Sequence, residues 1–268
     1  MVSLWGLHMA GHTAIITACA HEAALVRRRL RSQGQAAGTA GRVWQGVWQN
    51  QRVVLLQCGM GPERATQAVL WLSQHYQLVG VLSVGFAGGL QADLARGDAL
   101  LITNLRPLCD TPARVGCDAD VVLRPDARLA HIAAMAVAQA AIVSHTGTLL
   151  STTAVVAQAA AKQDIGRRSG ALAVDMESYS VGQVATQIHI PFAVLRTIFD
   201  TANETFSLPM TTCTTATGSV RPLRFLGCLA CQPWLLAQLP HWGWAAHVAG
   251  RHLQRWLQYF FLLLSQGA

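Results

Sequence analysis

Charged residues are scarce in this chain of 268 residues, and acidic residues are the scarcer kind. There are 13 Asp and Glu against 20 Lys and Arg, charged residues make up 12% of the chain, and the formal net charge is +7. A sparse, basic surface suits an anionic membrane or a nucleic acid. Nucleic-acid binding would require basic residues clustered beside aromatic ones, whereas here they are dispersed, apart from Arg27, Arg28 and Arg29. Those three are typical of a solvated helix face, so no nucleic-acid partner is expected.

The seven cysteines lack the spacing of a disulfide framework. Cys19 and Cys58 lie in apolar runs, and the CxxC pair of Cys228 and Cys231 has no second pair of ligands at zinc spacing. Buried reduced thiols are typical of the cytosol. The N-terminal segment lacks the basic start and apolar core of a signal peptide. The sequence therefore predicts a cytoplasmic protein without a metal or an organic cofactor.

Short β-branched runs alternate with longer helical patterns between Thr13 and Ile198. The predicted strands are residues 13–18, 43–48, 53–58, 79–84, 99–103, 144–150, 171–174 and 192–197. The predicted helices are residues 22–32, 62–75, 126–140, 155–164 and 177–187. This alternation predicts a three-layer α/β/α sandwich with a central mixed, mostly parallel sheet, plus a C-terminal helical extension. The expected units are a catalytic domain over residues 12–208 and an extension over residues 219–268.

Three of the few acids stand where predicted strands end. Glu22 follows the first strand, Glu177 the seventh and Asp200 the eighth. Because ligands bind beyond the carboxyl ends of parallel strands, these carboxylates are expected to meet. Converging carboxylates suit cleavage through a cationic transition state. Taken singly, each acid could instead start a helix or cap a turn, and the glycine-rich turns at 59–61 and 85–89 complete no nucleotide-binding fingerprint.

Four motifs resemble the nucleoside phosphorylase family, in its 5′-methylthioadenosine/S-adenosylhomocysteine nucleosidase branch. They are IITA at residues 15–18, GFAGGL at 85–90, VDMES at 174–178 and RTIFD at 196–200. The resemblance implies that Asp200 protonates purine N7 and that Glu22 positions and deprotonates the attacking water. It implies that Glu177 grips the ribose hydroxyls, with Met176 against the sugar. The predicted substrate-binding residues also include Phe86, Ala87, Gly88, Val155, Arg196 and Phe199.

The sequence departs from the family where phosphate and the base would bind. The phosphate-binding turns of the phosphorylases are replaced, and an acid at Glu22 would repel phosphate, so water is the expected nucleophile. Arg64 and the arginines at 27–29 keep phosphorolysis open as an alternative. Val155 stands where the nucleosidases have an aromatic residue on adenine, and Thr153 where they have Asp. Phe86 and Phe199 replace small polar residues, which predicts more apolar base and 5′ subsites.

The C-terminal extension carries an apolar stripe at helical spacing. No acid occurs in residues 221–264, and four of the eight tryptophans lie there. The stripe consists of Leu253, Trp256, Leu257, Phe260, Phe261 and Leu264. Since Pro233 and Pro240 interrupt the segment and no apolar run reaches about 18 residues, a spanning helix is not expected. The stripe fits an interfacial membrane helix, and equally a helix that docks on the enzyme or closes a homodimer.

Residues 61–65 and 218–223, with this extension, resemble hopanoid-associated phosphorylases. That resemblance implies removal of adenine from the membrane lipid adenosylhopane, giving ribosylhopane, on the inner face of the membrane. The alternatives are phosphorolysis of the same bond and a soluble methylthioadenosine nucleosidase whose extension builds a dimer. A protein that binds nucleosides or lipids without catalysis is a further alternative.

Overall fold

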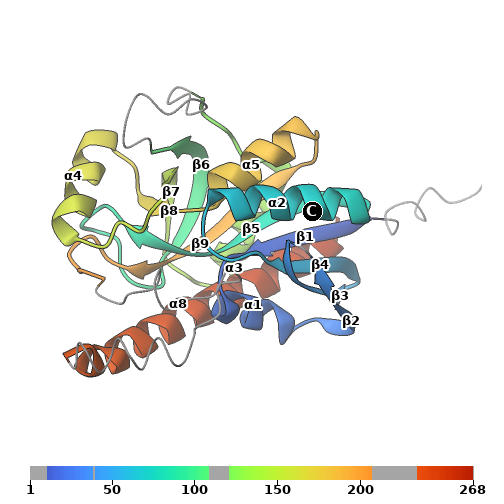
Figure 1. Ribbon diagram of the computed structural model, residues 1–268, viewed down its shortest axis with the longest axis horizontal. Helices are drawn as coiled ribbons and strands as arrows, with labels where there is room; N and C mark the ends of the chain where they lie inside the picture. Colours follow the sequence, from blue (N-terminus) through green and yellow to red (C-terminus); the bar gives the residue numbers. More distant parts are fainter. Residues whose placement is uncertain (1–10, 39, 109–120, 207–233, 268) are drawn as a thin grey trace, which may run out of the picture.

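The computed structural model describes residues 11–38, 40–108, 121–206 and 234–267. The strands are β1 (His12–Thr17), β2 (Arg31–Gly38), β3 (Gly41–Trp48), β4 (Gln51–Gln57), β5 (Leu78–Gly89), β6 (Ala99–Pro107), β7 (Ser144–Ser151), β8 (Ala173–Asp175) and β9 (Phe192–Asp200). The helices are α1 (Ala20–Arg27), α2 (Pro62–His75), α3 (Ala127–Gln139), α4 (Ala159–Ser169), α5 (Ser178–Gln187) and α8 (Trp234–Ser265). Helices α2 and α5 cover one face of the sheet, and α1, α3 and α8 cover the other (Figure 1). The predicted three-layer α/β fold is confirmed.

The sheet is mixed, with the strand order β2-β3-β4-β1-β5-β8-β7-β6-β9. Strand β1 runs parallel to β4 and β5, whereas β2, β3 and β4 pair antiparallel. Strand β5 pairs with both β8 and β9, and β9 also pairs with β6. Because β7 joins β6 to β8, the five strands from β5 to β9 form a closed ring. The carboxyl ends of β1, β8 and β9 meet beside this ring and place the three predicted acids.

The structure corrects three predicted elements. The first helix ends at Arg27, and the unpredicted strand β2 follows as a hairpin with β3. Residues 85–89 are not a turn, since they form the end of β5 and pair with β8 and β9. Helix α4 begins at Ala159 instead of residue 155. The CxxC pair, the motif at 218–223 and the predicted boundary between the two units lie outside the described residues.

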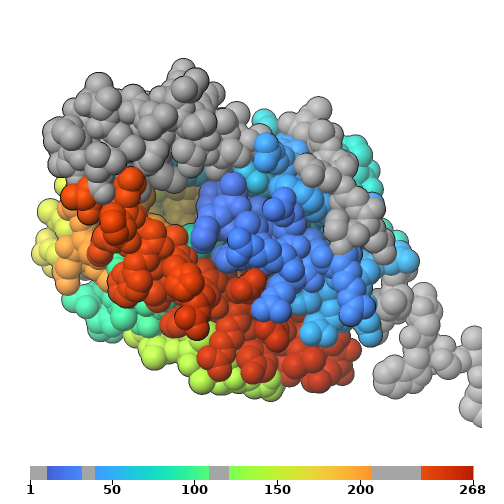
Figure 2. Space-filling view, turned by 90° about the horizontal axis from the view of Figure 1, so that it is seen from below, coloured from blue at the N-terminus to red at the C-terminus, as the bar shows by residue number. Residues whose placement is uncertain are grey.

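Helix α8 packs against the α/β fold through its apolar stripe. Leu253, Trp256, Leu257, Phe260 and Phe261 are fully buried in one cluster with α1 and α3. The Trp256 Nε1 group donates to the Ala133 carbonyl oxygen at 2.9 Å, and Phe261 stacks on Trp48. Figure 2 shows α8 lying alongside the N-terminal segment that contains α1. Of the alternatives that the sequence left open for this stripe, packing against the rest of the chain is confirmed. An interfacial membrane role for the stripe itself is wrong, because core residues cover it.

None of the helices among the described residues combines the length and the apolar character that crossing a bilayer requires.

Replacing Trp256 by Ala is expected to lower the free energy of unfolding by about 3 to 4 kcal/mol, because removal of the indole ring leaves a large cavity between α3 and α8. Urea denaturation measures the change. Trp244 on the same helix is 56% exposed, so Trp244→Ala should cost less than about 1 kcal/mol. Equal losses in the two variants would contradict the docked position of the stripe.

Candidate active site

Glu22 is held at the carboxyl end of β1, in the first turn of α1. Its Oε2 atom accepts hydrogen bonds from the backbone N–H groups of Ala18 and Cys19, both at 3.0 Å. Its Oε1 atom accepts from the N–H of Phe86 on β5 at 2.9 Å. Successive N–H groups of this kind make an anion-binding nest. Here the carboxylate of Glu22 itself occupies the nest.

Glu177 is the residue before the first turn of α5, two residues after the end of β8. Its Oε1 atom accepts a hydrogen bond from the N–H of Gly61, the residue before α2, at 2.8 Å. The side chain is buried, and its Oε2 atom lies 4.0 Å from the Arg196 guanidinium. Burial, reinforced by the negative charge of Asp175, raises the pKa of Glu177 to about 8. A carboxyl group of this kind can donate or accept a hydrogen bond near neutral pH.

Arg196 lies beneath the carboxylates and is 2% exposed. Its guanidinium pairs with Asp175 at 2.8 Å and donates to the hydroxyls of Ser83 and Ser178. A β-carbon at Gly85 would overlap both this guanidinium and the Glu22 carboxylate, which explains the glycine inside β5. The structure therefore gives Arg196 a supporting position, and its predicted contact with substrate stays a prediction.

Asp200 ends β9 and pairs with Lys162, a fully buried residue of α4. The Lys162 ammonium also donates to the backbone oxygens of Thr201, at 3.1 Å, and Glu204, at 2.8 Å. Sequence reasoning missed Lys162, although a signal was present. It is the single lysine of a chain with 19 arginines.

A small pocket opens beside Asp200 and is largely apolar. It is lined by Gly88, Thr152, Val155, Val156, Val174, Asp175, Met176, Asp200 and Phe206. The structure thus brings four predicted residues, Gly88, Val155, Met176 and Asp200, to one pocket. Val155 is 37% exposed and Phe206 contributes the aromatic ring of the pocket. The sequence offered no signal for Phe206, because it reaches the pocket through the chain beyond β9.

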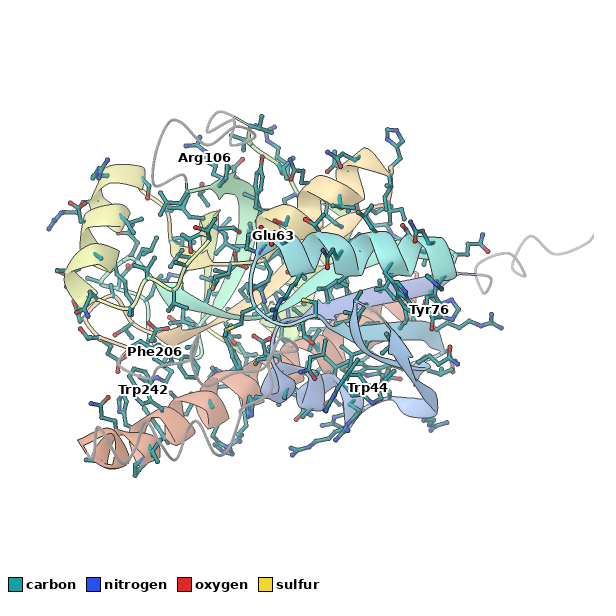
Figure 3. All side chains as sticks on the ribbon, viewed as in Figure 1. Trp44, Glu63, Tyr76, Arg106, Phe206 and Trp242 are labelled. Carbon is teal, nitrogen blue, oxygen red and sulfur yellow. The ribbon has the colours of Figure 1, made fainter. Side chains whose placement is uncertain are left out.

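An aromatic cluster joins this pocket to α8. Phe86 lies 5.6 Å from Phe199, which stacks on Trp242 of α8 at 5.8 Å between ring centroids. Phe206 packs edge-on against Trp242 at 4.7 Å (Figure 3). His21, next to Glu22, lies 5.8 Å from Phe86. The predicted residues Phe86 and Phe199 therefore sit together between the carboxylates and the C-terminal helix.

Ionisation of Glu177 is expected to destabilise the fold as the pH rises. The folded pKa of about 8 lies above the ordinary glutamate value of 4.5, so the folded state holds this proton more tightly than the unfolded state does. The free energy of unfolding therefore falls across that pH interval and levels off above it. Glu177→Gln removes this loss, so the variant should gain stability relative to the parent between about pH 5 and pH 9.

Urea denaturation at both pH values tests that relation. Glu63→Gln changes an exposed acid near the same end of α2 and should show no such gain. A Glu177→Gln difference that stays constant with pH would contradict the raised pKa.

Comparisons with known proteins agree with this geometry. The model of the phosphorylase superfamily matches residues 12–220. The 5′-methylthioadenosine/S-adenosylhomocysteine nucleosidase of Halalkalibacterium halodurans is 29% identical over 196 residues, covering 70% of this chain and 84% of that protein. The nucleosidase of Staphylococcus aureus strain JH9 is 22% identical, covering 70% and 86%.

Solved structures share the fold. The Helicobacter pylori 5′-methylthioadenosine/S-adenosylhomocysteine nucleosidase superposes with a TM-score of 0.69 at 20% identity, covering 93% of this chain and 98% of that one. A futalosine hydrolase of Helicobacter pylori strain 26695 gives 0.63 at 21% identity, covering 70% and 89%. Since the superfamily model spans most of the sequence, the chain belongs to the phosphorylase superfamily.

Proposed function

We propose that this protein is a purine nucleosidase that hydrolyses the N-glycosidic bond of an adenosine derivative. The observation that carries the proposal is the meeting of Glu22, Glu177 and Asp200 at one edge of the sheet, with Asp200 in an apolar pocket. The lining of the pocket is largely apolar, which suits the ring of a base, and its acid can protonate a leaving base. The nucleosidases among the relatives support the same reaction class.

Each carboxylate has a separate task in the proposed reaction. Asp200 gives a proton to purine N7, so that the base leaves as neutral adenine. Glu177 binds the ribose hydroxyls and, in its ionised form, stabilises the positive charge that develops on the sugar. Glu22 accepts a proton from the water that attacks C1′ as the electron pair of the glycosidic bond passes to the base.

Water is favoured over phosphate because Glu22 occupies the amide nest. The N–H groups of Ala18, Cys19 and Phe86 would suit a phosphate oxygen, but a carboxylate already binds all three. A second anion there would meet like-charge repulsion. The exposed arginines at 27–29 lie at the other end of α1, away from this nest.

The aromatic cluster supports an apolar 5′ substituent. Phe86 and Phe199 replace the polar side chains expected near the sugar, and Trp242 extends the apolar surface to α8. A substituent as large as a hopane would gain free energy by burial against these rings. We infer that the substrate is adenosylhopane and the products are ribosylhopane and adenine. A small methylthio group would leave much of this surface without a partner.

Adenine release from adenosylhopane and from methylthioadenosine tests this assignment. The enzyme should prefer adenosylhopane in kcat/KM by at least about tenfold, because several buried methylene groups add binding energy. Phe199→Ser should reduce that preference and leave methylthioadenosine cleavage nearly unchanged. A preference for methylthioadenosine would overturn the assignment of a lipid substrate and would leave the proposed nucleosidase reaction intact.

The proposed membrane contact lies on the exposed side of α8. Arg251 and Arg255 point away from the docked stripe and line a groove with Arg29. Helix α8 and the N-terminal segment that contains α1 supply this face, and no acid occurs in their described residues 23–38, 40–62 and 234–267. Figure 2 shows α8 and that segment side by side. We infer that this basic face rests on the anionic inner surface of the membrane; the homodimer stays a prediction from the sequence.

Sedimentation with phosphatidylglycerol vesicles tests the basic face. Arg251→Gln combined with Arg255→Gln should weaken binding by roughly tenfold or more, since each basic residue near the surface adds about 1 kcal/mol. Arg167→Gln with Arg168→Gln removes the same charge from exposed positions on α4 and should have little effect. Equal binding by all variants, or equal binding to uncharged phosphatidylcholine vesicles, would contradict the basic face.

A further inference from the structure

The single lysine of the chain is fully buried against the leaving-group acid. Nineteen of the 20 cationic side chains are arginines, and Lys162 alone is a lysine. It belongs to α4, a helix whose other charged residues, Asp164, Arg167 and Arg168, pair with one another near the surface. A compact ammonium fits where a planar guanidinium would need more space and more acceptors.

Every N–H of the Lys162 ammonium has an acceptor close to Asp200. One is the Asp200 Oδ2 atom, and the others are the backbone oxygens of Thr201 and Glu204. The ammonium therefore fixes both the carboxyl group and the turn that follows β9. Among the described residues, no donor is seen on the Asp200 Oδ1 atom, and the Asp200 carboxyl group lies beside Gly88, with which it lines the pocket described above.

Three charged side chains, those of Lys162, Glu204 and Arg96, affect the pKa of Asp200. Burial raises the pKa of Asp200, whereas the positive charge of Lys162 opposes that rise. Glu204 raises the pKa further and Arg96, which is paired with Glu204, lowers it. Asp175 lines the same pocket but is paired with Arg196. Lys162 is thus the cation in direct contact with the acid.

We propose that Lys162 is a positioning residue for proton transfer to the leaving base: it turns Asp200 Oδ1 toward the base and stabilises the carboxylate that remains. The inference rests on the proposed nucleosidase reaction. As the glycosidic bond breaks, its electron pair passes to adenine and the Asp200 proton moves to N7. Asp200 then carries a negative charge in a buried pocket, and Lys162, which keeps its own protons, neutralises it.

The kcat of Lys162→Met, measured against pH, tests the inference. The plateau should fall by about 10²-fold, because the acid loses both its orientation and its counter-charge. The basic limb, where Asp200 loses its proton, should move to higher pH because the ion pair no longer favours the carboxylate. Lys162→Arg should return the limb toward the parent position. If methionine prevents folding, Lys162→Gln removes the charge and keeps a hydrogen-bond donor.

Gln163→Met is the matched control, since Gln163 donates to Asn203 of the same turn from the same helix without a charge. It should leave the basic limb in place. A purely structural Lys162 would lower stability and kcat without moving the limb, which would overturn the inference.

A double-mutant cycle separates this inference from the reaction itself. If Lys162 acts through Asp200, adding Lys162→Met to Asp200→Asn should lower kcat little further. Additive losses would overturn the positioning role. Full activity of Asp200→Asn would instead overturn the proposed reaction.

Discussion

Replacing Asp200 by Asn is expected to lower kcat for adenine release by about 10²-fold to 10⁴-fold, the range for removing a general acid. The amide has nearly the shape of the carboxyl group, and its oxygen can still accept from Lys162. It cannot deliver a carboxyl proton to N7, so the base must leave as an anion. Adenine release is followed by single-turnover absorbance, and calorimetry should show that the variant still binds the nucleoside.

Asp164→Asn is the control for that variant, because Asp164 lies on α4 with a side chain that is half exposed. Its kcat should stay within about twofold of the parent, as for other surface changes. Thermal unfolding must show both variants folded, because Asp200→Asn also deprives Lys162 of its counter-charge. A folded Asp200→Asn protein with undiminished kcat would contradict the role of Asp200 as the general acid, whereas a parent protein that binds the nucleoside without releasing adenine would favour a non-catalytic binding protein.

Glu22→Gln should lower kcat for hydrolysis by about 10³-fold, and it discriminates between water and phosphate. The carboxylate accepts three backbone N–H groups, whereas an amide must turn its NH₂ group toward at least one of those donors. The variant loses the base that activates water, and at least one of the three backbone N–H groups loses its acceptor. A phosphorylase would respond differently, since removing the negative charge would relieve repulsion of phosphate.

The test measures the rate of adenine release by the parent and by Glu22→Gln, each with and without phosphate. Glu63→Gln changes an exposed acid at the start of α2 and should leave the rate unchanged. Phosphate-dependent activity that rises in Glu22→Gln would contradict the role given to Glu22.

The sequence predicted best those elements whose ends carry their own signals. Helix α2 begins at Pro62, as the proline at a first helical position indicates. Helix α3 is capped by Asp126, whose side chain accepts from the Leu129 N–H at 3.0 Å. Strand β2 carries no such signal, because its existence depends on pairing with β3. Its glycines and alanines have low strand propensity, and tertiary contacts override that propensity.

The carboxylates could be found because each follows a strand that pattern reasoning locates. Glu22, Glu177 and Asp200 are brought together by the parallel pairing of β1, β5 and β9 and by β8 beside them. Lys162 and Phe206 reach the same site through contacts that no local period encodes. The solitary lysine was visible in the composition, but only the structure joins it to Asp200.

The apolar stripe of α8 shows what the spacing of apolar residues can predict and what it cannot. The spacing from Leu253 to Leu264 correctly indicated an apolar helix face that needs a partner. It could not tell a bilayer from a protein core, because both bury the same atoms. The partner is settled by long-range contacts such as the Trp256 hydrogen bond to Ala133 and the stacking of Phe261 on Trp48.

The identity of the sugar product, with inorganic phosphate present, tests the central claim most directly. Purified enzyme is incubated with an adenosine substrate in phosphate buffer and in phosphate-free buffer, and the sugar is identified by mass spectrometry. With Glu22 in the amide nest, we expect free ribosyl product and equal adenine release in both buffers. A sugar 1-phosphate, with release that requires phosphate, would contradict hydrolysis by water.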